Sequence, residues 1–505
     1  YNISSLNYEE RIELFNSVLR KEPELISQCS HLFVDEIQDL VKSRARMVLN
    51  MIDNLPKDCG ITLFGDSCQS IYDYQVNEDV MSSLQFYKNL VERRSNFSYY
   101  SLARNYRQDS DLALTGDLYR KCILEGNTKK CDQMWNSTVG SFIQNYEVHN
   151  FEKITSDSLR YLTDKGTVGI LARTNGQALK ISSLLREKGI EHGLKKRLSD
   201  ASLCAWLGYA INNYQYMSID YDDFEELLKK YDQVDAEEAW ADIVECMRGV
   251  SGRIGIREML RSILMSAKGN SLYIKDMDCP LMVTNIHRGK GREFDTVLVE
   301  DSIFGEQQKS MEDHKVCYVA VTRPKAAIFK ICTNVRYMRI DKEGDRRCYE
   351  TKFGYNGKKL LSYVEVGFAA DVEKRSSVRM KDVQQYLRNI GNEIKGEKVV
   401  LIKESHSNGY VSYRIHYPKG NIDLGRTSMN FSESLERALR DIYNLPSRAK
   451  VYFDLFPRRL TDVYVDDVIS VIDETDGSEC GITTYGEMMV WNTISIVGYA
   501  KAEYI

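Results

Sequence analysis

The chain has 505 residues, 43% of them hydrophobic and 28% charged, which is the composition of a globular protein with room for about two to four domains. It contains no apolar run of membrane-spanning length, no signal segment and no Cys-x-x-Cys pair among its twelve cysteines, which predicts a cytoplasmic protein with reduced thiols and no membrane partner. A formal net charge of -5 would repel a polyanion, so any nucleic-acid site must be a local groove.

Two apolar strands near the start of the sequence each run into polar residues. The first, Leu32–Val34, is followed by Asp35 and Glu36, and the second, 61–64, leads into the polar stretch 65–74. Short continuous apolar runs suit strands buried on both faces of a parallel sheet, which binds ligands at the carboxyl ends of its strands. Paired carboxylates there can divide the work, one holding Mg²⁺ and the other orienting an attacking water. Taken alone, the motif also fits an acidic turn without function.

A second series of alternating strands and helices predicts a second α/β domain. Its strands are expected at 168–172, 281–287, 296–299 and 327–332. Gly189 is a natural end for the helix after the first of these strands, and Pro324 stops the helix before the last. Residues of about 200–270 are acidic and have a helical period without a good strand, which predicts a helical insertion.

The sequence after about Arg336 predicts a C-terminal α+β domain. Its expected elements are strands at 398–403, 410–417 and 421–425, a helix at 432–443 and a closing strand at 489–499. Asn408-Gly409 is a typical two-residue hairpin turn between the first two of these strands.

Six motifs occur along the chain in one order, although each is weak alone. They are Val34-Asp-Glu-Ile-Gln-Asp39, Gly65-Asp-Ser-Cys-Gln-Ser-Ile-Tyr72, Asn105-Tyr-Arg107, Arg173-Thr-Asn175, the stretch Thr284 to Phe294, and Tyr318-Val-Ala-Val-Thr-Arg323. In this order they resemble motifs II to VI of the UvrD/Rep/PcrA-type superfamily 1 DNA helicases, over about 32–333. The resemblance implies an α/β fold of tandem RecA-like parallel-sheet motor domains, the first of them incomplete, with a helical insertion and a C-terminal α+β domain.

The expected domain boundaries follow from the resemblance and the element pattern. Residues 1–100 form the C-terminal part of the first motor domain, 101–199 and 280–336 the two parts of the second, 200–279 the insertion and 337–505 an accessory domain. The insertion is short for this family, which argues against strong processive unwinding.

The resemblance also implies a site for ATP and Mg²⁺. The residues that it assigns to this site are Asp35 for the Mg²⁺ ion, Glu36 for the hydrolytic water, Gln69 as a sensor of the γ-phosphate, Arg107 and Arg323 as arginine fingers, and Glu293 for the ribose. A helix-end charge that complements the helix dipole is the alternative role for Arg323.

Six further residues are implied as contacts for single-stranded DNA. Tyr72 and Tyr74 would stack on bases, and the backbone contacts would be Arg173, Asn175, Thr284 and His287. The alternatives are a core or rim position for the tyrosine pair and an ordinary satisfied polar role for His287.

The sequence departs from the family pattern at several positions. Tyr74 stands where a tryptophan is usual, Arg292 replaces an apolar residue and adds charge near the nucleotide or DNA, and Pro324 replaces an alanine just after the second finger. The largest departure is that no Gly-x-x-x-x-Gly-Lys-Ser/Thr loop for the β- and γ-phosphates occurs in the 505 residues. We therefore expect that loop on a segment upstream of Tyr1 or on a bound partner.

These motifs predict an ATP-dependent 3′→5′ DNA helicase or translocase that acts on single-stranded DNA as one part of a larger polypeptide or complex. The presence of Asp35, Glu36, Gln69, Arg107 and Arg323 favours this function, because a protein without catalysis has no chemical need of all five. The missing lysine loop favours the alternative, a catalytically inactive helicase-fold DNA-binding or scaffold subunit. A third possibility is an accessory helicase subunit of a nuclease or anti-phage defence complex, with the C-terminal domain as the docking surface.

Overall fold

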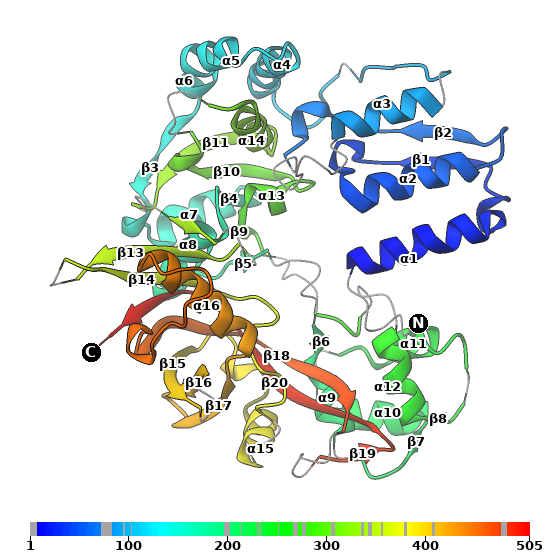
Figure 1. Cartoon of the computed structure of the whole chain (residues 1–505), viewed down its shortest axis with the longest axis vertical. Helices are drawn as coiled ribbons and strands as arrows, with labels where there is room; N and C mark the ends of the chain where they lie inside the picture. The colour runs from blue at the N-terminus through cyan, green and yellow to red at the C-terminus, as the bar shows by residue number, and fades with distance from the viewer. Residues whose placement is uncertain are drawn as a thin grey trace. The chain divides into compact units, whose positions relative to one another are not determined.

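The computed structural model divides the chain into two compact units, each built from two separate stretches of sequence. Unit 1 consists of Tyr1–Arg173 and Cys279–Thr333, and unit 2 of Thr174–Asp278 and Asn334–Ile505 (Figure 1). The residues that the structure describes are 8–71, 83–93, 96–102, 104–195, 202–212, 214–229, 231, 234–250, 252–265, 271–274, 279–304, 309–334, 338–341, 346–354, 357–377, 381–406, 410–475 and 482–504. Both units therefore depend on contacts between residues that are distant in sequence.

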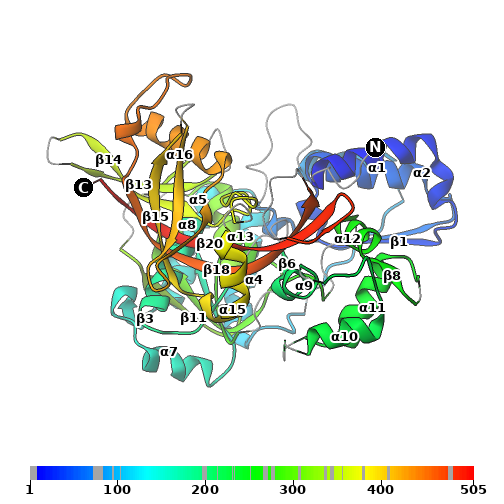
Figure 2. The same ribbon diagram turned by 90° about the horizontal axis from the view of Figure 1, so that it is seen from below.

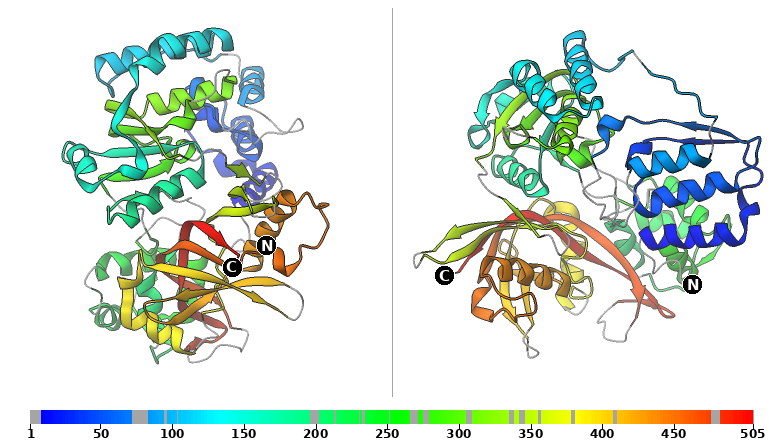
Figure 3. Two further views of the ribbon diagram at one scale, coloured as in Figure 1. Left: turned by 90° about the vertical axis from the view of Figure 1, so that its left-hand side faces the viewer. Right: turned by 45° about the horizontal axis from the view of Figure 1, so that its top comes forward.

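The first part of unit 1 is a pair of parallel strands with helices on one side. Its elements are α1 Tyr8–Lys21, β1 His31–Val34, α2 Lys42–Asn54, β2 Gly60–Leu63 and α3 Ser83–Arg93. β1 and β2 pair in parallel along their whole length. Leu32 and Val34 pack with buried residues of α2 and α3 such as Leu49 and Phe86, and these helices lie on the same side of the strand pair (Figure 3). The two predicted strands are confirmed.

The expectation that the first strand is buried on both faces is wrong. On the face opposite the helices, Phe33 is 66% exposed and stacks on His31, with 4.2 Å between the ring centroids. The physical reason is that the described part of this sheet contains two strands, and its hydrophobic cluster includes Leu32 and Val34 but neither His31 nor Phe33. An apolar run alone does not distinguish a strand covered on both faces from one with an open face.

The second part of unit 1 is a parallel sheet with buried strands. Its strands in this unit are β3 Gln144–Asn150, β4 Val168–Ala172, β9 Leu281–Asn285, β10 Phe294–Glu300 and β11 Pro324–Cys332. They lie in the order β3-β11-β10-β4-β9, and each neighbouring pair is parallel. β4 and β9 are buried at every position. The predicted parallel α/β architecture is thus confirmed.

Helices of this part connect and cover the strands. They are α4 Ser110–Leu124, α5 Thr128–Met134, α6 Gly140–Phe142, α7 Ser156–Thr163, α13 Ile286–Gly289 and α14 Met311–Val321, with a π-helical turn at Trp135–Val139. A buried contact of 2.6 Å joins the Tyr119 hydroxyl of α4 to Nδ1 of His314 on α14. Asp132 of α5 lies 3.2 Å from the other nitrogen of that ring. Burial lowers the pKa of His314, so the ring is neutral at pH 7 and serves as a fixed link between these helices.

Unit 2 is built on a large antiparallel sheet with the order β12-β13-β14-β20-β18-β15-β16-β17. These strands are β12 Arg339–Ile340, β13 Cys348–Phe353, β14 Lys359–Val366, β15 Lys398–Ser405, β16 Val411–Tyr417, β17 Ile422–Arg426, β18 Arg459–Glu474 and β20 Met488–Glu503, and its helices include α15 Lys381–Ile390 and α16 Met429–Ile442. The long strands β18 and β20 run side by side (Figure 2). The predicted strands, helix and closing strand are confirmed, whereas β18 and the β13–β14 hairpin were not predicted. The expected turn Asn408-Gly409 lies outside the described residues.

The predicted insertion is helical and lies in the same unit as this sheet. The other elements of the unit include α8 Asn175–Glu187, β6 Leu203–Cys204, α9 Ala205–Ile211, β7 Ser218–Ile219, α10 Tyr221–Leu228, α11 Ala236–Cys246, β8 Ile254–Gly255 and α12 Ile256–Met265. The short strands correct the expectation that this stretch has none, because each pairs over only two residues and leaves no pattern in the sequence. β6 pairs with β18, and Asn492 donates a hydrogen bond to the carbonyl of Ala205 at 2.8 Å. The domain boundaries drawn from the sequence stay a prediction.

Candidate active site

The carboxyl ends of β1 and β2 bring together two carboxylates and an amide that the sequence singles out. Asp35 and Glu36 follow β1, and Gln69 lies in the 3₁₀ turn Ser67–Gln69 after β2. Asp35 is exposed, and its Oδ1 accepts a hydrogen bond from the backbone N–H of Glu36 at 2.8 Å. Glu36 has a φ of 52°, a left-handed conformation that costs a non-glycine residue about 1–3 kcal/mol and that clusters at active sites.

The buried amide of Gln38 ties the turn after β1 to the turn after β2. Its side chain is 1% exposed, donates from Nε2 to a carboxylate oxygen of Glu36, and accepts at Oε1 from the backbone N–H of Asp66 at 3.0 Å. Asp66 also accepts from Nε2 of Gln69 and from the hydroxyl of Tyr318, each at 3.1 Å. One chain of hydrogen bonds therefore orients both Glu36 and Gln69.

Lys290 belongs to this site although the sequence motifs did not assign it a role. Its side chain is 6% exposed, and its ammonium lies 2.6 Å from Oδ1 of Asp39 and 3.3 Å from Oε2 of Glu36. It also donates a hydrogen bond to the backbone carbonyl of Gln69 at 3.0 Å. Burial raises the pKa of Asp39, and the ammonium of Lys290 opposes that rise. A lysine flanked by glycines was visible in the sequence, but its carboxylate partners are distant along the chain.

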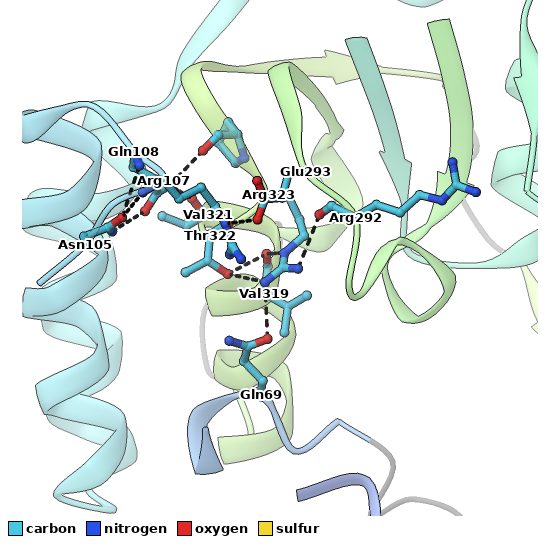
Figure 4. A network of polar contacts seen from close by, with 11 residues as sticks. Gln69, Asn105, Arg107, Gln108, Arg292, Glu293, Val319, Val321, Thr322 and Arg323 are labelled. Carbon is cyan, nitrogen blue, oxygen red and sulfur yellow. Dashed lines mark hydrogen bonds and ion pairs between the residues drawn. The ribbon is translucent and has the colours of Figure 1, made fainter. Parts of the chain in front are cut away.

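Arg323 occupies a buried position beside Gln69. It is 2% exposed, and its Nη2 donates to Oε1 of Gln69 at 3.2 Å (Figure 4). Its Nη1 donates to the backbone carbonyl of Arg292 at 3.4 Å, and its Nε donates to the carbonyl of Val319 at 3.1 Å. Burial lowers the pKa of Arg323 to about 10, so the guanidinium stays charged at neutral pH. The hydrogen bond to Val319 also satisfies a backbone carbonyl near the end of α14. This contact agrees with the alternative role of Arg323, a positive charge at the helix end that complements the helix dipole.

The other expected finger, Arg107, is paired with the residue expected to bind the ribose. Nε of Arg107 lies 2.6 Å from Oε1 of Glu293, and its Nη1 donates to the carbonyl of Thr322 at 3.3 Å (Figure 4). Asn105 fixes this turn, because its Oδ1 accepts from the backbone N–H groups of Arg107 at 2.9 Å and Gln108 at 3.1 Å. The structure thus gathers Glu36, Gln69, Arg107, Glu293 and Arg323 into one region of unit 1.

Three of the expected DNA contacts, Arg173, Thr284 and His287, lie at or just beyond the carboxyl ends of the neighbouring parallel strands β4 and β9. Arg173 is ion-paired with Asp313 at 2.7 Å, and Thr284 is buried, with its hydroxyl donating to the carbonyl of Asn285 at 3.1 Å. His287 is half-buried on α13, and Asn175 is the first residue of α8 in unit 2. Tyr72 and Tyr74 lie outside the described residues. The roles of all these residues in DNA binding stay predictions.

The residues at the end of β1 fit a nucleotide-bound Mg²⁺ ion. Such an ion is held by one or two carboxylates together with phosphates and waters, rather than by a dedicated protein cage. Asp35 has an exposed carboxylate directly after β1. Within the described ranges, no three or more His, Cys, Asp or Glu side chains lie close enough together to bind a metal ion. The described residues therefore contain no candidate for a metal site whose ligands all come from the protein.

Comparison with known families matches two stretches of the chain. Residues 3–89 match the UvrD/REP helicase N-terminal domain, and residues 280–329 match the UvrD-like helicase C-terminal domain. Comparison with curated proteins gives no match. None of the helices in the described part of the chain combines the length and apolar character needed to cross a membrane. The polar network from Glu36 through Lys290 and Gln69 to Arg323 connects the two matched stretches.

Proposed function

We propose that this chain, a superfamily 1 helicase of the UvrD/Rep-like type, hydrolyses ATP to move in the 3′→5′ direction along single-stranded DNA. The observation that carries the proposal is the hydrogen bond between Arg323 and Gln69, which sets a buried, charged guanidinium beside the amide that follows β2. A cation and an amide so placed suit the developing charge on a transferred phosphoryl group.

In this proposal the residues at the carboxyl ends of β1 and β2 divide the chemistry. Glu36 orients the attacking water and accepts its proton, and Gln69 and Arg323 bind the γ-phosphate. Arg107 leaves Glu293 to reach the phosphate, and Glu293 then becomes available to the ribose. Asp35 would hold Mg²⁺, which when bound neutralises charge on the β- and γ-phosphates.

The proposal also requires a lysine loop for the phosphates, which the 505 residues do not contain. We place this loop on a segment outside these residues, or on a partner, that packs against the open face of β1 and β2. The exposed ring of Phe33 and the half-buried residues of β2 are the support for this placement. Strands of parallel sheets are ordinarily covered on both faces.

The test compares this chain with a polypeptide or complex that includes the phosphate loop. We expect phosphate release that single-stranded DNA stimulates, and faster displacement of streptavidin from a 5′-biotin than from a 3′-biotin, because a 3′→5′ motor runs toward the 5′ end. Equal displacement from both ends would contradict the direction. Hydrolysis by these 505 residues alone would contradict the placement of the loop.

The alternative is a catalytically inactive DNA-binding subunit. It is favoured by Lys290, whose ammonium already pairs with Asp39 and Glu36. DNA binding without hydrolysis in the presence of the phosphate loop would select this alternative. Capture of a nuclease or another subunit by residues 337–505 would instead indicate the accessory-subunit role.

A further inference from the structure

Lys290 lies on the loop between α13 and β10, and its side chain reaches the turns that follow β1 and β2. Its ammonium contacts Oδ1 of Asp39 at 2.6 Å, Oε2 of Glu36 at 3.3 Å and the backbone carbonyl of Gln69 at 3.0 Å. An ammonium has three donors and no acceptor, so it can serve several oxygens at once. Because the side chain is 6% exposed, these oxygens replace the water that the charge would otherwise require.

The ammonium is shared unequally between its two carboxylates. The shorter contact goes to Asp39, whose side chain is 21% exposed, and the longer contact goes to Glu36, whose side chain is 49% exposed. Coulomb attraction falls with distance and with the access of water, so Asp39 provides most of the compensation for the buried charge. The contact with Glu36 therefore adds less to the charge balance, and its main effect is on where the Glu36 carboxylate lies.

The two carboxylate oxygens of Glu36 have different surroundings. Oε2 accepts a hydrogen bond from Nε2 of the buried Gln38 and also lies against Lys290. Gln38 is itself fixed by the backbone N–H of Asp66, at 3.0 Å from its Oε1. Within the part of the chain that the structure describes, Oε1 of Glu36 forms no hydrogen bond. The carboxylate is thus held through one oxygen, and the other oxygen can accept a hydrogen bond from a water.

We propose that Lys290 is a positioning residue, which holds the carboxylate of Glu36 where its Oε1 meets the attacking water. The inference rests on the proposed function, in which Glu36 orients and deprotonates that water. A general base must lie within hydrogen-bond reach of the proton that it accepts, and a small misplacement lowers turnover. Glu293 lies on the same loop as Lys290 and pairs with Arg107 at 2.6 Å. One loop would therefore position both the general base and an arginine finger.

The test uses a form of the protein that includes the phosphate loop and measures ATP hydrolysis in the presence of single-stranded DNA. Lys290→Met is expected to lower kcat by about 10²-fold and to leave KM and the binding of a fluorescent ATP analogue unchanged, because Lys290 acts on Glu36 and not on the substrate. The matched control is Lys121→Met, at an exposed lysine of α4, which should hydrolyse ATP as the unmodified protein does. Thermal unfolding shows whether the variants are folded.

A cycle of double variants separates positioning from a general effect on structure. If Lys290 acts through Glu36, Lys290→Met should lower kcat no further in a protein that already carries Glu36→Gln. A general loss of structure would lower the residual turnover again. The variant Lys290→Met/Asp39→Asn also removes the uncompensated carboxylate, so it replaces Lys290→Met in the test if that variant does not fold. It should show the same loss of kcat.

Each outcome decides the inference. A loss of kcat at unchanged KM that is absent in the Glu36→Gln protein supports it. Normal turnover in Lys290→Met overturns it while leaving the proposed function intact, and so does an increase, which would mean that the ammonium restrains Glu36. A further loss in the Glu36→Gln protein, or normal turnover in Lys290→Met/Asp39→Asn, assigns the effect to structure or to Asp39 and overturns it. An unmodified protein that binds ATP without hydrolysing it contradicts the proposed function and the inference together.

Discussion

The two parallel sheets of unit 1 differ in how completely they are covered. β1 alternates exposed and half-buried residues, whereas β4 and β9 are buried at every position. Both sheets nevertheless place side chains of the candidate site beyond the carboxyl ends of their strands, Glu36 after β1 and Lys290 after β9 and α13. Strand direction sets where these side chains emerge, and the covering layers set the burial of the strand. We therefore expect substitutions at the open sheet to affect chemistry and those in the covered sheet to affect stability.

The largest effect is expected at the end of the open sheet. In a form of the protein that hydrolyses ATP, Glu36→Gln should reduce turnover by about 10²–10⁴-fold, because the group that orients and deprotonates water is lost. The side chain of Glu36 is 49% exposed, and a glutamine keeps an oxygen that can accept from Gln38, so the free energy of unfolding should change by no more than about 1.5 kcal/mol, mainly through the lost charge beside Lys290. ATP hydrolysis and thermal unfolding measure the two quantities, with Glu92→Gln on the exposed side of α3 as the control. Near-normal turnover would remove Glu36 from the mechanism.

The covered sheet should respond in the opposite way. Ile170→Ala in β4 removes buried methyl and methylene groups and should lower the free energy of unfolding by about 2–5 kcal/mol, as measured by urea denaturation. Nucleotide and DNA binding should persist below the unfolding transition, since Ile170 lies within β4 and not beyond the carboxyl ends of the strands, where the candidate site residues lie. A loss below about 0.5 kcal/mol would mean that this strand is not fixed as firmly as its burial indicates.

The difference between the sheets also explains what the sequence could predict about the fold. Strand positions such as Val168–Ala172 follow from local apolar runs, and helix ends such as Gly189, which has a φ of 66°, follow from local backbone preferences. The open face at Phe33 could not be predicted, because coverage depends on what packs there and not on the strand itself. The 16-residue strand β18 was missed because acidic residues interrupt its Val- and Ile-rich positions, which leaves no continuous apolar run.

The same distinction holds for the candidate site. Asp35 and Glu36 were found because they directly follow an apolar strand, and Gln69 was found through the family resemblance of the motif that contains it. Lys290 was not found in this way, because a buried cation is recognised by the carboxylates that it pairs with. Its partners, Glu36 and Asp39, lie far from it along the chain. Pairings across the fold, including that of Arg107 with Glu293, become visible only when the strands are assembled.

Lys290→Met should produce a smaller, pH-dependent loss of stability. Without the ammonium, the pKa of Asp39, which burial already raises, should rise further. The native state then binds the proton more tightly than the unfolded chain, so stability falls as pH rises from the unfolded pKa of 3.8 through the raised native pKa. We expect a loss of about 1–3 kcal/mol at neutral pH and a smaller loss near pH 4. Denaturation at several pH values measures this dependence.

A second substitution separates charge from packing at Lys290. In the double variant Lys290→Met/Asp39→Asn, the uncompensated carboxylate is removed, so most of the pH dependence should disappear. If the double variant keeps the full pH dependence, Asp39 is not the group responsible, and Glu36 becomes the candidate.

The smallest effect is expected at the open face itself. Phe33 is 66% exposed, so Phe33→Ser removes about a third of the contribution of a buried aromatic side chain, or about 0.5–1 kcal/mol of the free energy of unfolding. Leu32→Ser is the matched control, because Leu32 lies next to it on the face that packs with α2 and α3 and should cost more. Urea denaturation of this chain measures both. Equal losses would mean that the face is covered in solution, and the contrast between the two sheets would then disappear. In a polypeptide or complex that supplies the phosphate loop, the loss for Phe33→Ser should instead approach that for Leu32→Ser, since the proposed segment covers the ring.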